Sequence, residues 1–446
     1  MRQHCGRRPL MLQRIHWSAG MPRRARSLLG GNRPATVLLT AAPAPTTTQR
    51  IPRPLAAIAE AADIRFNGDR PWDLRVHHPG LYGALLRHGS MALGDGYVRG
   101  DWDCDQLDEL ICRLLRVDAN RPLSRRAWLL DHLRRLQEQL GNPQSLQRAF
   151  RVGRQHYDID PRVYAAMLDP GMSYSCGYWR HADDLATAQQ EKLRLICEKL
   201  QLRPGQRLLD LGCGWGALAE FASRHYGVEV VGITVSKRQA QFARERLSDL
   251  PVTVLLCDYR QLPLLHNAPF DRVASVGMFE HVGRRNDACF HNLVRHCLHP
   301  DGLALLHTIG SARTSLRTDA WIDAHIFPGG RLPSASQLCR GLEGRLLIED
   351  WENFGSDYDR TLMAWWQNFA DAWPELQRDS CSEFYRFWRY YLLSCAGFFR
   401  SRQGQLWQLV LSRSERAGVY RSWRPADIQQ RGWMTQRTAA NEGQGR

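Results

Sequence analysis

Short apolar runs alternate with amphipathic stretches along the middle of the chain. Five runs have the length of buried strands: Arg207–Leu211, Val228–Ile233, Val252–Cys257, Phe270–Val276 and Leu303–Thr308. Three stretches between them carry apolar side chains at helical spacing: Ala217–Tyr226, Lys237–Ser248 and His291–Leu298. Strands that alternate with helices form a parallel sheet covered by helices on both faces. The pattern therefore predicts an α/β fold with a doubly wound, Rossmann-like sheet.

The preceding segment, residues 54–145, has a different pattern. Helical spacing occurs in three stretches: Leu55–Ala62, Leu81–His88 and Leu107–Val117. Asp63–Val76 is predicted to form short strands around an Asn67-Gly68 turn, since this dipeptide favours hairpins. Gly89–Asp103 is predicted to be a glycine-rich connection. This segment is expected to be a small α+β domain, ending in a charged helix over Arg121–Gln144.

Residues 146–423 are expected to form one larger domain. Residues 151–200 contain two helical patterns around a dense loop at 169–179, and residues 331–420 are predicted to be mostly helical. The last stretch is crowded with aromatic residues: Trp365, Trp366, Phe369, Trp373, Phe384, Phe387, Trp388, Tyr391, Phe398 and Phe399. Such a density of rings is typical of a hydrophobic core.

The formal net charge of +15 is concentrated near residue 1. Residues 1–53 hold ten Arg and no Lys, Asp or Glu, which leaves 50 basic and 45 acidic side chains in the other residues. A net charge of only +5 there argues against nucleic-acid binding, which needs a concentrated basic face. We expect 1–53 to be a disordered extension, with an organelle transit peptide or an upstream mis-start as alternatives. A second disordered tail is expected at 424–446.

Cysteine usage and hydropathy narrow the class of protein further. The twelve Cys show no zinc-type spacing, so no metal site is expected, and reduced thiols in a cytosolic protein are the simplest interpretation. No apolar stretch approaches the roughly 20 residues that a membrane-spanning helix needs. The chain is therefore not expected to cross a bilayer, although it can still bind to one.

A candidate cofactor loop follows the first predicted strand. Leu208–Gly216 reads Leu-Leu-Asp-Leu-Gly-Cys-Gly-Trp-Gly, with three glycines between the strand and its helix. Glycine permits a tight turn and a close approach of backbone to a ligand. The loop residues expected to bind the cofactor are Asp210, Gly212, Cys213, Gly214, Trp215 and Gly216.

Two features favour S-adenosylmethionine over a dinucleotide. The acid Asp210 precedes the first glycine by two residues, whereas dinucleotide folds use a related but different glycine pattern. Asp258 and Tyr259 follow the third strand, where folds of this type present an acid and a ring to adenine. A glycine turn in an α/β domain without a nucleotide is the alternative.

The second predicted strand departs from the usual methyltransferase pattern. Most such strands end in an acid that binds the ribose hydroxyls, but this one ends Val231-Gly232-Ile233-Thr234. Thr234, Ser236 and Gln239 are the polar residues expected to replace that acid.

Six motifs occur in a fixed order along the chain. They are Tyr174-Ser175-Cys176-Gly177-Tyr178-Trp179, Leu209–Gly216, Gly277-Met278-Phe279-Glu280-His281-Val282-Gly283, Leu306-His307-Thr308-Ile309-Gly310, Ile326-Phe327-Pro328-Gly329-Gly330 and Ser394-Cys395-Ala396-Gly397-Phe398-Phe399. Together they closely resemble the cyclopropane-fatty-acyl-phospholipid synthase family, over residues 55–420. After His156-Tyr157-Asp158, this chain departs from the family pattern, because it has Asp160-Pro161-Arg162 where the family usually continues Gly-Asn-Asp.

The resemblance implies a reaction. The family transfers a methyl group from S-adenosylmethionine to a cis double bond in a phospholipid acyl chain. A carbocation-like species develops, and a proton then leaves the new methyl group as the ring closes. The resemblance implies a bound bicarbonate as the base, which would need a polar site within an apolar tunnel.

Site residues follow from the same resemblance. It places Glu280, His307, Tyr358, Cys176 and the backbone of Ile309 around the bicarbonate, and it adds Tyr174 and Ser175 to the cofactor site. Cys395 is expected only to line the pocket, because methyl transfer to an alkene needs no thiolate; a covalent role is the alternative. The aromatic helices become a candidate tunnel wall or membrane-facing surface.

The resemblance also implies a setting. We expect a cytoplasmic protein bound peripherally to the inner face of the membrane, with the phospholipid bilayer as partner, no nucleic acid, and a homodimer as a candidate assembly. Three other functions stay open: a lipid methyltransferase with a branched or methoxy product, a nucleic-acid methyltransferase, and a non-catalytic lipid-binding relative.

Overall fold

The computed structural model describes residues 50–117, 161–265, 269–314, 318–377 and 381–425. The expected tails lie outside these ranges apart from 50–53 and 424–425, and the expected charged helix Arg121–Gln144 lies outside them entirely. Of the segment that departs from the family pattern, Pro161 and Arg162 are described, and Pro161 begins α8 (Pro161–Met167). Within the described residues, no helix is both long and apolar enough to span a membrane.

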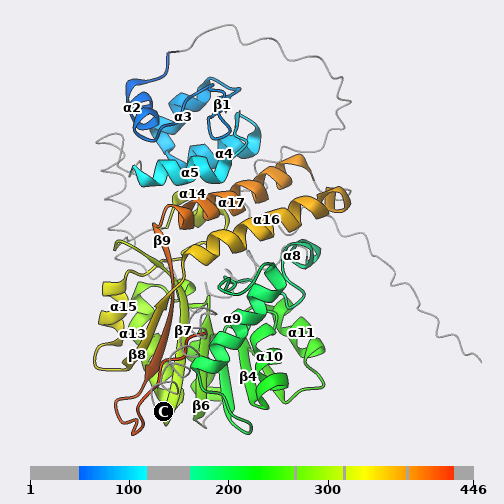
Figure 1. Cartoon of the computed structure of the whole chain (residues 1–446), viewed down its shortest axis with the longest axis vertical. Helices are drawn as coiled ribbons and strands as arrows, with labels where there is room; N and C mark the ends of the chain where they lie inside the picture. The colour runs from blue at the N-terminus through cyan, green and yellow to red at the C-terminus, as the bar shows by residue number, and fades with distance from the viewer. Residues whose placement is uncertain (1–49, 118–160, 266–268, 315–317, 378–380, 426–446) are drawn as a thin grey trace, which may run out of the picture.

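A seven-stranded mixed sheet forms the centre of the molecule, with the strand order β5-β4-β3-β6-β7-β9-β8 (Figure 1). The strands are β3 (Arg207–Leu211), β4 (Glu229–Thr234), β5 (Val252–Leu256), β6 (Phe270–Val276), β7 (Leu298–Ser311), β8 (Leu347–Asn353) and β9 (Gly404–Ser412). β3 to β7 are parallel, as the alternating pattern predicts, whereas β9 lies antiparallel between β7 and β8. Residues 331–420 are mostly helical as expected, but they also contain β8 and β9, which the pattern did not predict.

Both faces of the sheet are covered, because successive apolar side chains of each strand point to opposite sides. Leu208 belongs to one core and Leu209 to the other. Helices α9 (Leu185–Lys199), α10 (Ala217–Tyr226) and α11 (Lys237–Arg246) pack on the first face. The second face is covered by α12 (Leu262–Leu265), α13 (Asp287–Cys297) and α15 (Ala335–Leu342).

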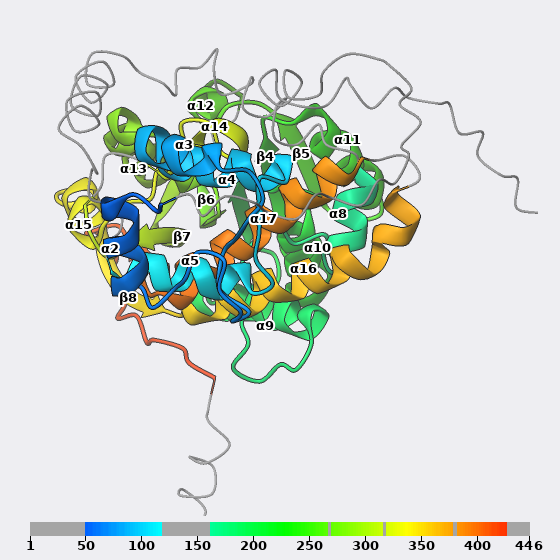
Figure 2. The same ribbon diagram turned by 90° about the horizontal axis from the view of Figure 1, so that it is seen from above.

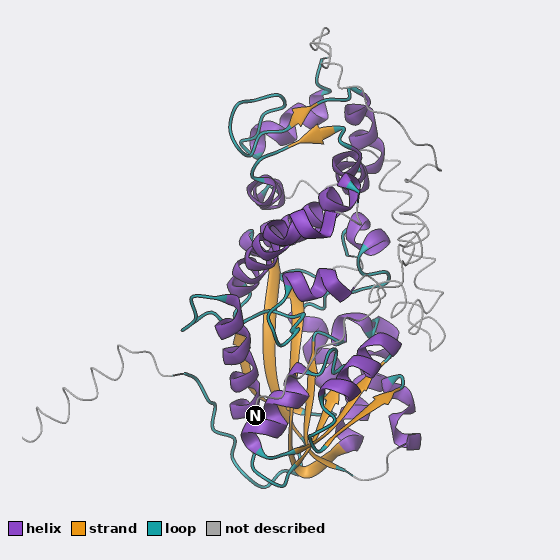
Figure 3. Cartoon of the chain, turned by 90° about the vertical axis from the view of Figure 1, so that its right-hand side faces the viewer, coloured by secondary structure: helices purple, strands orange, loops and turns teal. Residues whose placement is uncertain are grey.

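Two long helices, α16 (Ser356–Leu376) and α17 (Ser382–Arg400), lie side by side beyond one end of the sheet (Figures 1 and 3). Their facing rings are in contact; the centroids of Phe369 and Trp388 are 6.0 Å apart, for example. Trp365 and Phe369 are fully buried, so the expected aromatic core is present.

The N-terminal unit packs on α17 from the side away from the sheet (Figures 1 and 2). It contains α2 (Arg53–Ala61), α3 (Gly80–His88), α4 (Ser90–Arg99), α5 (Leu107–Arg116), β1 (Arg75–Val76) and β2 (Trp102–Asp103). Its core is continuous with that of α16–α17. The expected boundary at 145/146 lies outside the described residues and stays a prediction.

Two expectations for this unit are wrong. The glycine-rich connection contains helix α4, whose Gly94 packs so closely on Trp321 of α14 (Ala320–His325) that a Cβ would lie 2.4 Å from the indole. Asn67-Gly68 does not form the expected hairpin: Phe66 and Leu74 form a single isolated parallel bridge, and β1 pairs with β2 instead. In both cases, contacts with residues distant in sequence override the local pattern.

Candidate active site

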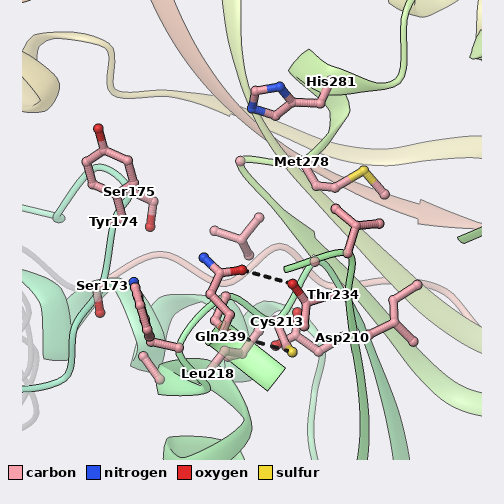
Figure 4. A pocket seen from close by; sticks show the side chains of 18 of the residues that line it. Ser173, Tyr174, Ser175, Asp210, Cys213, Leu218, Thr234, Gln239, Met278 and His281 are labelled. Carbon is pink, nitrogen blue, oxygen red and sulfur yellow. Dashed lines mark hydrogen bonds between the residues drawn. The ribbon is translucent and has the colours of Figure 1, made fainter. Parts of the chain in front are cut away.

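A pocket that opens to solvent lies where β3, β4, β5 and β6 end. This is the edge at which open α/β sheets bind ligands, and the strand order reverses there between β3 and β6. Figure 4 shows Tyr174 and Ser175 on one side of the pocket and Met278 and His281 on the other. Eleven of the residues expected to bind the cofactor line it: Tyr174, Ser175, Asp210, Gly212, Cys213, Gly214, Trp215, Thr234, Gln239, Asp258 and Tyr259.

The glycine loop adopts backbone conformations that favour glycine. Gly212 and Gly214 have φ values of +90° and +55°, in the left-handed region. Gly216 has a φ of +92°, but it is the N-cap residue of α10 and does not line the pocket. A Cβ there would lie 2.9 Å from Leu247. Two of the three glycines therefore present backbone to the pocket, and the third allows the turn.

A buried carboxyl group and a buried amine contribute to the same pocket. Asp210 is 2% exposed, and its Oδ2 has no hydrogen-bond partner among the described residues. Lys192 of α9, which sequence reasoning missed, is also 2% exposed and donates to Ser175 Oγ over 3.0 Å. Burial raises the pKa of Asp210 to about 7 and lowers that of Lys192 to about 8, and each charge opposes the shift of the other.

The residues expected to replace the acid after β4 form one hydrogen-bonded group. Thr234 Oγ1 donates to Gln239 Oε1 over 2.9 Å, and both side chains line the pocket (Figure 4). Ser236 does not line it; its Oγ caps α11 by accepting the backbone N–H of Gln239 at 3.3 Å. Ser236 therefore positions the helix that carries Gln239.

The acid after β5 is already paired within the protein. Asp258 accepts from the guanidinium of Arg260 at 2.7 and 2.8 Å and also caps the turn Tyr259–Gln261. Tyr259 packs edge-on against Phe290 with ring centroids 5.8 Å apart. Arg260 thus lines the pocket beside Asp258, although the sequence pattern did not indicate it.

Next to this pocket, Glu280 lies buried beside β7. Its Oε1 accepts the backbone N–H of Ile309 at 2.7 Å, and its Oε2 has no hydrogen-bond partner among the described residues. Burial raises the pKa of Glu280 to about 7. The Ile309 amide, expected to bind bicarbonate directly, instead holds this carboxyl group in place.

His307 lies two residues before Ile309, on the same face of β7. It is 1% exposed, its Nδ1 lies 3.1 Å from Gln408 Nε2, and its Nε2 has no partner among the described residues. Burial, together with the charges of Lys192 and Lys199, holds the pKa of His307 well below its usual value. The imidazole is therefore neutral at physiological pH.

Cys176 and Tyr358 share a small apolar core with Ile309. The Cys176 thiol donates to the Gly177 carbonyl over 3.1 Å, and burial raises its pKa well above the usual value. Tyr358 stacks on Phe399 with ring centroids 4.5 Å apart. Because Ser175 lines the pocket and Cys176 is the next residue, this core adjoins the pocket.

Cys395 lies on α17 among the aromatic core residues. Burial raises the pKa of its thiol to about 12. A thiolate nucleophile is disfavoured at that position. Cys395 is not among the residues that line the pocket at the strand ends, so its expected pocket-lining role stays a prediction.

The model of the mycolic acid cyclopropane synthetase family matches residues 144–409. The chain belongs to the cyclopropane synthase family. It is 48% identical over 358 residues to the cyclopropane-fatty-acyl-phospholipid synthase of Escherichia coli (strain K12), covering 80% of this chain and 92% of the relative.

The mycobacterial mycolic acid synthases match a smaller part of this chain. Cyclopropane mycolic acid synthase 1 of Mycobacterium tuberculosis (strain H37Ra) is 34% identical, covering 58% of this chain and 95% of the relative. The solved structure of the cyclopropane synthase MmaA2 from Mycobacterium tuberculosis superposes with a TM-score of 0.55 at 32% identity, covering 59% of this chain and 98% of that chain. The structure of mycolic acid cyclopropane synthase CmaA1 complexed with SAH and CTAB also has a TM-score of 0.55, at 31% identity, and covers 59% of this chain and 98% of that chain.

Proposed function

We propose that this chain is a cyclopropane-fatty-acyl-phospholipid synthase, an S-adenosylmethionine-dependent enzyme. It converts the cis double bond of an unsaturated phospholipid acyl chain into a cyclopropane ring. The observation that carries this proposal is the 48% identity spanning 92% of a relative of that name. Glu280 and His307, both buried beside the pocket, supply the polar groups that ring closure would need.

The pocket suits S-adenosylmethionine, which supplies the methyl group when it is bound. Gly212 and Gly214 leave room for a ligand to approach the backbone, and Thr234 and Gln239 present polar atoms at the end of β4. Lys192 offers the pocket a buried cation that suits the carboxylate of the methionyl group, while the unpartnered Oδ2 of Asp210 suits a donor. The complex of a relative with SAH supports this assignment.

A bicarbonate site at Glu280 and His307 is part of the proposal. Bicarbonate would supply the base that takes the proton lost on ring closure. A buried Glu280 whose pKa is about 7 can be protonated and so donate to an oxyanion, which avoids repulsion between two negative charges. Cys176 and Tyr358 would complete the surroundings, with Ile309 holding Glu280 through its backbone amide.

The proposed setting of the enzyme follows from its substrate. A phospholipid substrate requires contact with a bilayer surface, so we propose peripheral binding at the inner, cytoplasmic face of the membrane. The homodimer and the part of α16–α17 in enclosing the acyl chain stay predictions.

The test uses vesicles of an unsaturated phospholipid with S-adenosylmethionine and bicarbonate. Mass spectrometry should show lipid that has gained one CH₂ unit, and proton NMR of that lipid should show the high-field methylene signal of a cis-cyclopropane. Vesicles of saturated phospholipid serve as the control and should show no gain.

The NMR signal separates the alternatives. A mass gain with a vinylic or methyl-branch signal would instead support a branched-product methyltransferase. No mass gain in the presence of bicarbonate would refute both lipid functions. Glu280→Gln should bind S-adenosylhomocysteine as the wild type does and lose turnover; lost binding would show that Glu280 belongs to the cofactor site.

A further inference from the structure

A chain of buried polar side chains extends from His307 away from the pocket. Gln408 of β9 is the direct cross-strand partner of His307 in β7, and its Nε2 lies 3.1 Å from His307 Nδ1. The Oε1 of the same amide accepts from Lys199 Nζ at 2.8 Å. Gln408 and Lys199 are fully buried, so solvent does not compete for these hydrogen bonds.

Lys199 is held in place and kept charged by a carboxylate. Its Nζ also donates to Glu352 Oε2 of β8 over 2.6 Å, and Glu352 Oε1 accepts from Tyr178 Oη at 3.2 Å. Arg424 lies within 3.5 Å of Glu352 as a second cation. Burial lowers the pKa of Lys199, whereas the negative charge of Glu352 opposes that fall. The carboxylate oxygen lies 2.6 Å from Nζ, and an opposite charge at that distance favours the ammonium form.

The ammonium group fixes the direction of every hydrogen bond in this chain. An ammonium has donors only, so the Gln408 atom that faces Lys199 must be the amide oxygen. The amide nitrogen of Gln408 then faces His307 and donates to it, so His307 Nδ1 accepts. A neutral imidazole that accepts at Nδ1 carries its proton on Nε2.

The proton on Nε2 has no protein acceptor among the described residues. Leaving a buried donor unpaired costs about 1–3 kcal/mol, so such a donor indicates a ligand acceptor. His307 shares a face of β7 with Ile309, whose amide holds Glu280 and whose side chain packs with Cys176 and Tyr358. The surrounding polar groups are those proposed to surround an oxyanion.

We propose that Lys199 and Gln408 are positioning residues for catalysis: they hold His307 as the Nε2–H tautomer, so that its imidazole donates a hydrogen bond to the oxyanion bound beside Glu280. This inference rests on the proposed function. Neither residue contacts the reacting atoms; both act through the imidazole.

The tautomer can be measured in the wild-type protein without any turnover. Long-range ¹H–¹⁵N NMR on protein labelled with ¹⁵N-histidine distinguishes Nε2–H from Nδ1–H, and the signal lost in His307→Asn identifies His307. We expect a neutral ring protonated on Nε2. A ring protonated on Nδ1 would overturn the proposal.

Reversing the hydrogen bond between Gln408 and His307 Nδ1 tests whether the tautomer matters for turnover. In Gln408→Glu a carboxylate faces Nδ1 and can only accept, so the proton should move to Nδ1. With phospholipid vesicles we expect kcat to fall about 10–100-fold, as for other residues that orient a functional imidazole, with unchanged KM for S-adenosylmethionine and lipid. Gln405→Glu, on the same strand but partly exposed, is the matched control and should keep wild-type kcat.

Wild-type kcat in a folded Gln408→Glu variant would overturn the positioning role. Thermal denaturation shows whether Gln408→Glu folds. If this variant does not fold, the tautomer of His307 is measured in Lys199→Met instead. Without the ammonium, both amide orientations are open and a mixture of His307 tautomers is expected, whereas a single Nε2–H tautomer would contradict the proposal. Absence of cyclopropane product from the wild type would count against the proposed function and leave the tautomer measurement valid.

Discussion

Replacing Glu280 by glutamine should stabilise the ligand-free protein, and more so as the pH rises. Burial raises the pKa of Glu280 from its ordinary 4.5 to about 7. The folded state therefore binds this proton more tightly than the unfolded state, and stability falls as the pH rises from 4.5 to 7. Glutamine keeps the Oε1 acceptor for the Ile309 amide and never ionises.

The expected size follows from the pKa difference. One pKa unit corresponds to about 1.4 kcal/mol, so the advantage of Glu280→Gln over wild type should be about 3 kcal/mol at pH 8 and about 1 kcal/mol at pH 5. At roughly 2 °C per kcal/mol, the melting temperature should rise by about 6 °C at pH 8 and about 2 °C at pH 5. Wild type and variant share all their other titrating groups, so the contributions of those groups to the difference in stability cancel.

The assay is thermal denaturation of both proteins at the two pH values, without ligand. Glu60→Gln removes an exposed carboxylate of α2 and serves as the control, for which we expect no change that depends on pH. A Glu280→Gln protein that melts below wild type at pH 8, or that gains equally at both pH values, would refute the buried-acid interpretation of this site.

Two further predictions concern packing and cofactor binding. A Cβ at Gly397 of α17 would lie 2.4 Å from the Asp108 carbonyl oxygen, so Gly397→Ala should cost about 1–3 kcal/mol, measured as a lower melting temperature. Gly83→Ala in α3 meets only the flexible Arg87 side chain and should be neutral or slightly stabilising; equal losses in both would contradict the argument. Lys192→Met should weaken S-adenosylhomocysteine binding by calorimetry about tenfold or more, the value of a hydrogen bond to a charged group. Lys237→Met removes an exposed charge and should leave the affinity unchanged, and wild-type affinity in Lys192→Met would exclude its role in the pocket.

Much of the parallel half of the sheet could be predicted from the sequence. Arg207–Leu211 and Phe270–Val276 are strands with the predicted bounds, and Ala217–Tyr226 is a helix as predicted. Buried parallel strands appear as continuous apolar runs, so local pattern is sufficient for them. The glycine loop was visible for the same reason, because its chemistry is contained in nine consecutive residues.

The missed features depend on partners that are distant in the chain. The acidic residues Asp350 and Glu352 make the sequence of β8 look like a solvent-exposed segment. In the structure these two carboxylates pair with Arg424 and Lys199. Lys199 and Gln408 are separated by 209 residues, so no local pattern indicates their hydrogen bond. Lys192 likewise lies in an amphipathic helix, and only the packing of α9 on the sheet shows that its charge is buried.

The antiparallel insertion of β9 has a consequence for synthesis of the protein. β7 emerges from the ribosome about a hundred residues before Gly404–Ser412, and His307 is 101 residues away from Gln408. Until β9 enters between β7 and β8, β7 is an edge strand with unpaired backbone groups. Such an exposed edge can pair with another chain and so promote aggregation. The cofactor loop belongs to strands that can pair earlier, so a nascent chain can form its nucleotide pocket before it can orient its imidazole.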